Sequence, residues 1–87
     1  MTERYNVAIK VLSQKGTCNA GHKVGDEWVV NNKTPEGICL AAFLSLAPHI
    51  WTLMFGGSFP WEIDSGVVVT VCPDPDNPVL FELRRIS

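Results

Sequence analysis

Residues 67–85 of this chain, VVVTVCPDPDNPVLFELRR, contain two strand patterns separated by a proline-rich segment. Residues 67–72 are almost wholly apolar and rich in β-branched side chains, and residues 79–85 alternate apolar with charged side chains. Both patterns predict strands. The proline-rich segment 73–78 between them is too rigid for anything except a turn, so we expect an antiparallel hairpin.

Two further strands are expected upstream of this hairpin. Residues 4–12 alternate apolar with polar side chains, which is the period of a half-buried strand. The glycines of residues 13–26 predict a loop that turns repeatedly, and residues 27–30 resume as a short strand.

A helix is expected between the two pairs of strands. The Thr-Pro-Glu triplet at residues 34–36 supplies a cap, a first-turn proline and a carboxylate near the positive end of the helix dipole, so the helix is predicted over residues 35–47. Pro48 cannot continue it without losing a backbone hydrogen bond. We therefore expect a break there and a second helical segment over residues 49–55, closed by Gly56. The predicted fold class is α+β, with a small, mostly antiparallel sheet and a broken helical segment packed on one face.

The composition predicts one folded domain spanning residues 1–87. The chain is 46% hydrophobic and 18% charged, with a net charge of −2. The chain has seven Lys and Arg and nine Asp and Glu, so it lacks the excess of basic residues that nucleic-acid binding requires. Residues 38–55 are mostly apolar, but Pro48 and His49 interrupt them, so no membrane partner is expected. The first residues lack the pattern of an export signal, and we expect a cytoplasmic protein with reduced thiols.

Three cysteines and one histidine are the first candidates for chemistry. Cys18 and His22 lie four residues apart in the glycine-containing loop, Cys39 lies in the first turns of the predicted helix, and Cys72 ends a strand. Three thiols and an imidazole match in kind the ligand sets that hold zinc in tetrahedral sites, although only Cys18 and His22 have close spacing. We therefore predict a metal site for zinc or iron, with Cys18, His22, Cys39 and Cys72 gathered at one end of the sheet.

Two other interpretations use the same residues differently. In a thiol-based redox or nucleophilic enzyme, Cys72 is the nucleophile, His22 its base and Asp74 the group that orients His22, although Asp-Pro after a strand is more often simple turn chemistry. In a small-ligand-binding or protein-interaction module, the cysteines only pack as small hydrophobic residues.

The aromatic residues predict self-association. Trp61 lies in a loop beside Phe59 and Pro60 and is a candidate interface residue, whereas Trp51 fits the core. A small sheet also leaves strand edges unpaired, so we expect a homo-oligomer. His49 is not expected to be a metal ligand.

Three short motifs occur in a fixed order along the chain. They are Cys18-Asn19-Ala20-Gly21-His22, Gly37-Ile38-Cys39 and Cys72-Pro73-Asp74. This series, C-x2-GH followed by GxC and CPD, resembles a family of small bacterial and archaeal proteins of unknown function, over nearly the whole chain. The resemblance implies a one-domain protein in which the matching Cys18, His22, Cys39 and Cys72 are the site residues, and it implies no activity.

Overall fold

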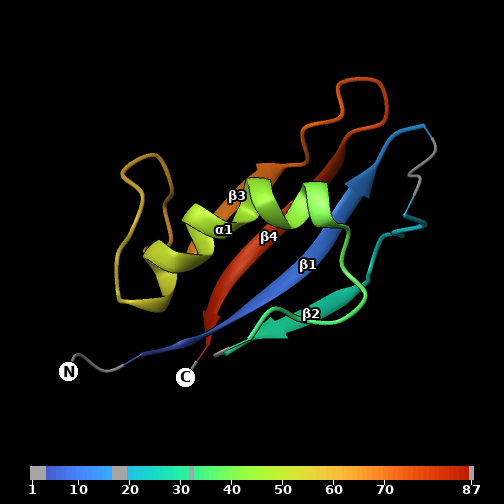
Figure 1. Ribbon diagram of the computed structural model, residues 1–87. Coiled ribbons are helices and arrows are strands. Elements are labelled where there is room, and N and C mark those ends of the chain that lie inside the picture. The colour runs from blue at the N-terminus through green and yellow to red at the C-terminus, as the bar shows by residue number, and fades with distance from the viewer. Residues whose placement is uncertain (1–3, 17–19, 32, 87) are drawn as a thin grey trace.

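The computed structural model describes residues 4–16, 20–31 and 33–86, which form an antiparallel sheet with a helix across one face (Figure 1). In chain order the elements are β1 (Asn6–Gln14), β2 (Glu27–Val30), α1 (Leu40–Met54), β3 (Val67–Val71) and β4 (Val79–Ile86). The strand order is β2-β1-β4-β3, and each neighbouring pair is antiparallel. The predicted α+β class and the predicted β3–β4 hairpin are confirmed.

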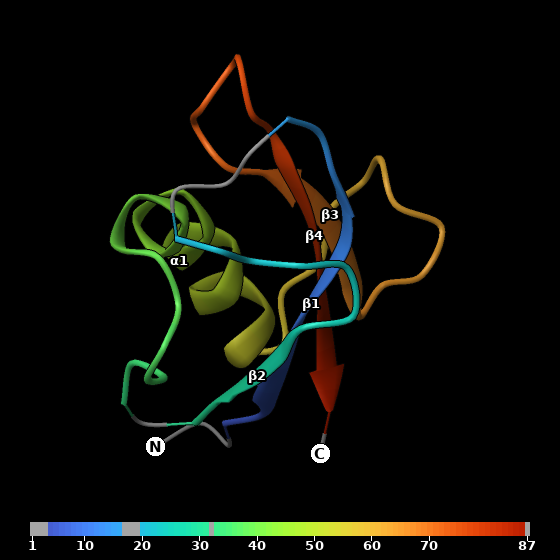
Figure 2. The same cartoon turned by 90° about the vertical axis from the view of Figure 1, so that its right-hand side faces the viewer.

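The hydrophobic core lies between α1 and the sheet face that it covers (Figure 2). Alternate residues of β1 point into this core, as the two-residue period of a strand requires: Val7, Ile9 and Val11 have no exposed surface. The buried core residues are Val7, Ile9, Val11, Val30, Ala42, Leu46, Ile50, Leu53, Met54, Val68, Val79, Phe81 and Leu83.

The other face of the sheet carries charged side chains. Lys10 lies on that face, since its neighbours Ile9 and Val11 point into the core. In the strand register it is opposite Glu27 on one side and Glu82 on the other. Cross-strand pairs of opposite charge stabilise a sheet modestly, so this ladder favours the observed register.

The edge strand β3 is covered in part by the loop at residues 57–66. The backbone N–H of Val69 donates to Oε2 of Glu62 at 3.1 Å, which satisfies a donor that an edge strand otherwise leaves open. The guanidinium of Arg85 donates to the carbonyl oxygens of Gly57 and Ser65, near the two ends of the same loop. These contacts hold the loop against the sheet.

The predicted start of the helix is wrong. α1 begins at Leu40 rather than at residue 35, because Gly37 has a φ of 91°, a left-handed conformation that cannot belong to a right-handed helix. Cys39 is the N-cap residue and makes no side-chain capping bond to the described residues. The first helical bond runs from the N–H of Phe43 to the carbonyl of Cys39 at 2.9 Å.

The predicted break at Pro48 is also wrong, because Pro48 lies inside the continuous helix α1. Proline lacks an N–H and leaves the carbonyl four residues earlier, that of Leu44, without its helical partner. Pro48 and Leu44 are both exposed, so water can reach this carbonyl. On the opposite side, Leu46 and Leu53 are fully buried and hold the helix against the sheet.

The predicted end of the helix at Gly56 is confirmed. Gly56 has a φ of 85°, and its N–H donates to the carbonyl of Leu53 at 3.1 Å. The N–H of Gly57 donates to the carbonyl of Thr52 at 2.8 Å. This pair of bonds is the Schellman motif that closes many helices.

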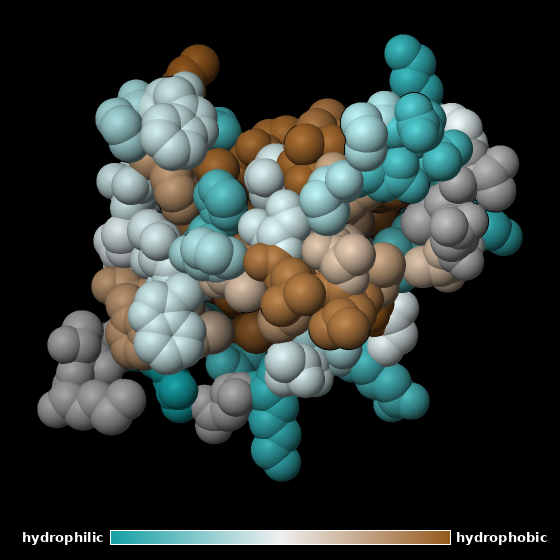
Figure 3. Space-filling view, turned by 45° about the horizontal axis from the view of Figure 1, so that its top comes forward, coloured by the Kyte–Doolittle hydropathy of each residue, from teal (hydrophilic) through white to brown (hydrophobic). Residues whose placement is uncertain are grey.

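The outward side of α1 is apolar. Leu40, Leu44 and Trp51 are 74%, 66% and 67% exposed, so the assignment of Trp51 to the core is wrong. Figure 3 shows apolar side chains gathered near the centre of one face of the molecule, with polar surface around them. In the described part of the chain, which includes the apolar residues 38–55, no helix has the length and apolar character to cross a bilayer.

We expect Pro48→Ala to raise the free energy of unfolding by about 2 kcal/mol, because alanine restores the N–H that bonds the Leu44 carbonyl. Urea unfolding measures the change. Pro60→Ala is the matched control, since Pro60 is exposed in a loop and its replacement should give no gain. A Pro48→Ala variant no more stable than Pro60→Ala would contradict this account of the helix.

Candidate functional site

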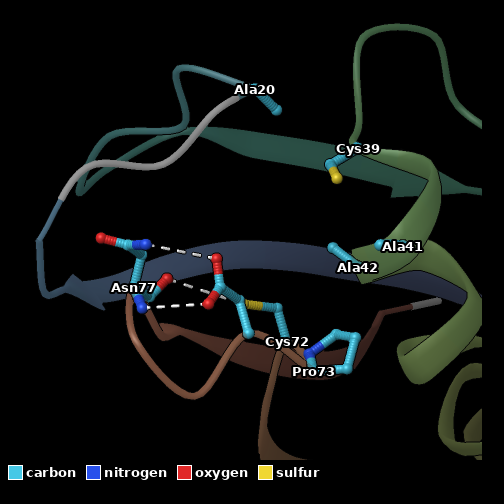
Figure 4. A pocket seen from close by; sticks show the side chains of 8 residues that line it. Ala20, Cys39, Ala41, Ala42, Cys72, Pro73 and Asn77 are labelled. Atoms are coloured by element: carbon cyan, nitrogen blue, oxygen red, sulfur yellow. Dashed lines mark hydrogen bonds between the residues drawn. The ribbon is translucent and has the colours of Figure 1, made fainter.

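Two of the predicted site cysteines line one pocket. This cavity, of about 190 Å³, lies between the start of α1 and the turn that follows β3 (Figure 4). Cys39 and Cys72 both line it, both are partly exposed, and both are free thiols within the described part of the chain. The other lining residues are Ala20, Ala41, Ala42, Pro73, Asp74 and Asn77. We call this cavity the thiol pocket.

His22 holds Cys39 in place through the backbone. The N–H of Cys39 donates to Nε2 of His22 at 2.9 Å. The His22 side chain is nearly buried, and its ring lies edge-on to Trp28 and Phe81, with centroids 4.9 and 6.3 Å away. Because Nε2 accepts a hydrogen bond, the ring is the neutral tautomer that carries its proton on Nδ1. The imidazole thus satisfies one of the N–H groups that a helix start leaves without an internal partner.

Cys72 is held by the first residue of β4. Its N–H donates to the carbonyl of Val79 at 3.0 Å, and the N–H of Val79 donates to Sγ of Cys72 at 3.2 Å. The thiol itself points toward the carbonyl oxygen of Asn77, 4.0 Å away. The sulfur of Cys72 thus lies between one backbone N–H donor, that of Val79, and one backbone carbonyl acceptor, that of Asn77.

Asp74 lines the thiol pocket, but the hydrogen bonds of its carboxylate are made to residues of its own turn. Its Oδ1 accepts from the N–H groups of Asp76 and Asn77 at 3.1 and 3.2 Å, and its Oδ2 accepts from Nδ2 of Asn77 at 3.4 Å. Figure 4 shows the bonds from Asn77 as dashed lines. An aspartate that bonds backbone groups two and three residues later is ordinary turn chemistry. A catalytic role of Asp74 stays a prediction.

Asn77, which belongs to none of the three sequence motifs, is part of the pocket wall. Its side chain also lies so close to Gly16 that a Cβ there would clash with Oδ1 of Asn77. Gly16 has a φ of 70°, so both the backbone conformation and the close approach require glycine. The Asp-Asn-Pro series at residues 76–78 signals a turn, but no local pattern shows that this turn meets the end of β1.

The four predicted metal ligands have different positions in the structure. Cys39 and Cys72 share the thiol pocket, His22 contacts the backbone of Cys39, and Cys18 lies outside the described residues. Among the residues that are described, no group of three His, Cys, Asp or Glu side chains is arranged to hold a metal ion. The four-ligand site therefore stays a prediction that depends on Cys18.

Comparison of this chain with models of protein families, with curated proteins and with solved structures finds no match. The resemblance to small proteins of unknown function stays a prediction. The function is therefore inferred from the geometry of the site.

We expect His22→Phe to lower the free energy of unfolding by about 1–3 kcal/mol, because it removes the acceptor for the N–H of Cys39 while keeping a ring against Trp28 and Phe81. The amide proton of Cys39 should also exchange faster with solvent in this variant. Urea unfolding and hydrogen exchange measure the two effects.

The matched control is His49→Phe. Nδ1 of His49 is buried without a hydrogen-bond partner among the described residues, and the ring lies 5.3 Å from that of Phe59. Phenylalanine should therefore be tolerated at position 49 without loss of stability. Equal losses in the two variants would show that the hydrogen bond to Cys39 is not what His22 contributes.

Proposed function

We propose that this protein is a thiol-based redox protein that reduces small disulfides at the thiol pocket. The observation that carries the proposal is that Cys39 and Cys72, far apart in the chain, line the same cavity as free thiols. Three small side chains, those of Ala20, Ala41 and Ala42, leave room beside them. Free thiols are kept in this state in a reducing compartment, so the proposed location is the cytoplasm.

The proposed reaction is thiol–disulfide exchange in two steps. The thiolate of Cys72 attacks one sulfur of a small disulfide; a bond forms between the two sulfurs, and the other sulfur of the disulfide leaves as a thiolate that takes up a proton. The thiolate of Cys39 then attacks Sγ of Cys72, which forms a Cys39–Cys72 disulfide and releases the second small thiol. Two electrons pass from the two protein thiols to the substrate.

The surroundings of the two sulfurs support these roles. Sγ of Cys72 already accepts a hydrogen bond from the N–H of Val79, and this bond holds the sulfur in place at the wall of the pocket. Cys39 is the N-cap residue of α1, where the positive end of the helix dipole stabilises a thiolate. His22 acts as a positioning residue rather than as the base, since its Nε2 is used by the N–H of Cys39.

We expect Cys72→Ser to slow the reaction with 5,5′-dithiobis(2-nitrobenzoate), an aromatic disulfide, by about tenfold or more. Cys39→Ser should react at the normal first rate and then stop at the mixed disulfide on Cys72. Cys18→Ser is the matched control and should behave as the unmodified chain does. Absorbance of the released thiol and intact-protein mass measure the rate and the product.

Two results would contradict the redox proposal. One is that Cys72 in the folded protein reacts with 5,5′-dithiobis(2-nitrobenzoate) no faster than the cysteines of the urea-unfolded chain do. The other is a mixed disulfide that persists in the unmodified protein, because the second step requires attack by Cys39.

Metal binding is the second candidate function, because the same two thiols are soft ligands that suit zinc or iron. The described residues alone do not supply three ligands, so this function requires Cys18 as well. Metal analysis of protein purified without chelator separates the two candidates. One metal ion per chain, lost in both Cys18→Ser and Cys72→Ser, would favour zinc or iron binding over redox chemistry.

Self-association through the loop at residues 57–66 is a further part of the proposal. It is supported by Trp61, which is 66% exposed, and by Ile63, which is fully exposed. We expect light scattering at micromolar concentration to give a mass above the 9.6 kDa of one chain, and Trp61→Ser to lower it. Val24→Ser, which changes an exposed apolar residue elsewhere, should leave the mass unchanged. A monomer mass for the unmodified protein would contradict this expectation.

A further inference from the structure

A second cavity lies beside α1 and shares no lining residue with the thiol pocket. Its described lining residues come from the segment before β1, the end of β2, the connector that follows β2, and α1 from Phe43 to Met54. Figure 2 shows the described part of this connector, residues 33–39, leading into the start of α1. We call this cavity the β2–α1 pocket, and its volume is about 190 Å³.

The buried residues that line the β2–α1 pocket are apolar, and the polar lining residues Asn31 and Thr34 come from the connector after β2. Val30, Ile50 and Met54 line it and are at most 5% exposed, so they are fixed by the core beneath them. Phe43 and the exposed Trp51 add aromatic surface. An apolar cavity of about 150 Å³ in another protein holds benzene, so this pocket has the size for a single aromatic ring.

The rim of the pocket is positively charged. Arg4 and Lys33 line it, and no acidic residue is found among its described lining residues. This local excess of cations contrasts with the chain as a whole, which has a net charge of −2. A cationic rim above an apolar floor matches a ligand that carries one negative group on an apolar body.

We infer that the β2–α1 pocket binds a small monocarboxylate whose apolar part has the size of one aromatic ring. The ring lies on the floor formed by Val30, Ile50 and Met54, and the carboxylate faces Arg4 and Lys33. A second copy of α1 fits the pocket less well, because residues 40–54 contain no acidic side chain to meet the two cations. This inference does not depend on the proposed thiol chemistry.

The chain has two methionines, so methyl NMR of methionine-labelled protein reports directly on the pocket. Met54 lines the pocket, and Met54→Leu assigns its signal. The probes are 3-phenylpropionate and its neutral counterpart 3-phenyl-1-propanol. We expect both to shift the Met54 signal saturably, with the acid binding about fivefold more tightly than the alcohol.

Charge variants separate the carboxylate contact from simple apolar binding. Arg4→Gln combined with Lys33→Gln should weaken binding of the acid about fivefold and leave the alcohol unchanged. Lys15→Gln combined with Lys23→Gln removes the same charge at exposed positions that do not line the pocket and should change the affinity for neither probe by more than about twofold. Ala47→Phe, which fills the pocket, should abolish the shift with both probes.

Three outcomes would overturn the inference. The first is that 3-phenylpropionate at up to about 10 mM gives no saturable shift of the Met54 signal. Such a result would mean that any dissociation constant lies above the millimolar range. The second is equal binding of acid and alcohol that the Arg4 and Lys33 changes do not alter. The third is a Met54 signal that follows protein concentration together with a dimer mass in light scattering, which would make a second copy the occupant.

Discussion

The hydrogen bond from the N–H of Cys39 to Nε2 of His22 fixes where α1 starts. The His22 ring packs against Trp28 of β2 and Phe81 of β4, so this one bond ties the helix start to the sheet. A donor left unpaired at that partly buried position would cost about 1–3 kcal/mol. Since both pockets are lined by residues of α1, their shape depends on this anchor.

Local patterns predicted the strands well and the helix less well. The alternation in β1 and the proline-rich turn after β3 are properties of adjacent residues, and the structure follows both. The helix start depends on His22, 17 residues before Cys39, and on the left-handed Gly37. Pro48 is tolerated because tertiary packing of the opposite helix side outweighs one lost bond. The strand order depends on contacts between distant segments, which periodicity does not report.

The candidate site was predictable only in part, because some of its contacts join segments that are far apart in the chain. Cys39 and Cys72 stand near the ends of elements, and side chains from element ends meet where loops gather, so their shared pocket follows from their positions. The sequence does not show whether an imidazole is directed at a sulfur or at a backbone N–H. His22 takes the second role in the structure. The β2–α1 pocket has no motif, because its cations and its apolar floor come from separate segments.

His22 anchors the helix start, which leaves the cysteine sulfurs for chemistry. Long-range nitrogen NMR of the imidazole tests this role most directly, recorded with and without one equivalent of zinc. We expect the ring proton of His22 on Nδ1 and a coupling across the hydrogen bond from the Cys39 amide to Nε2, and zinc should change neither. A proton on Nε2, or loss of this coupling as zinc binds Nε2, would contradict it.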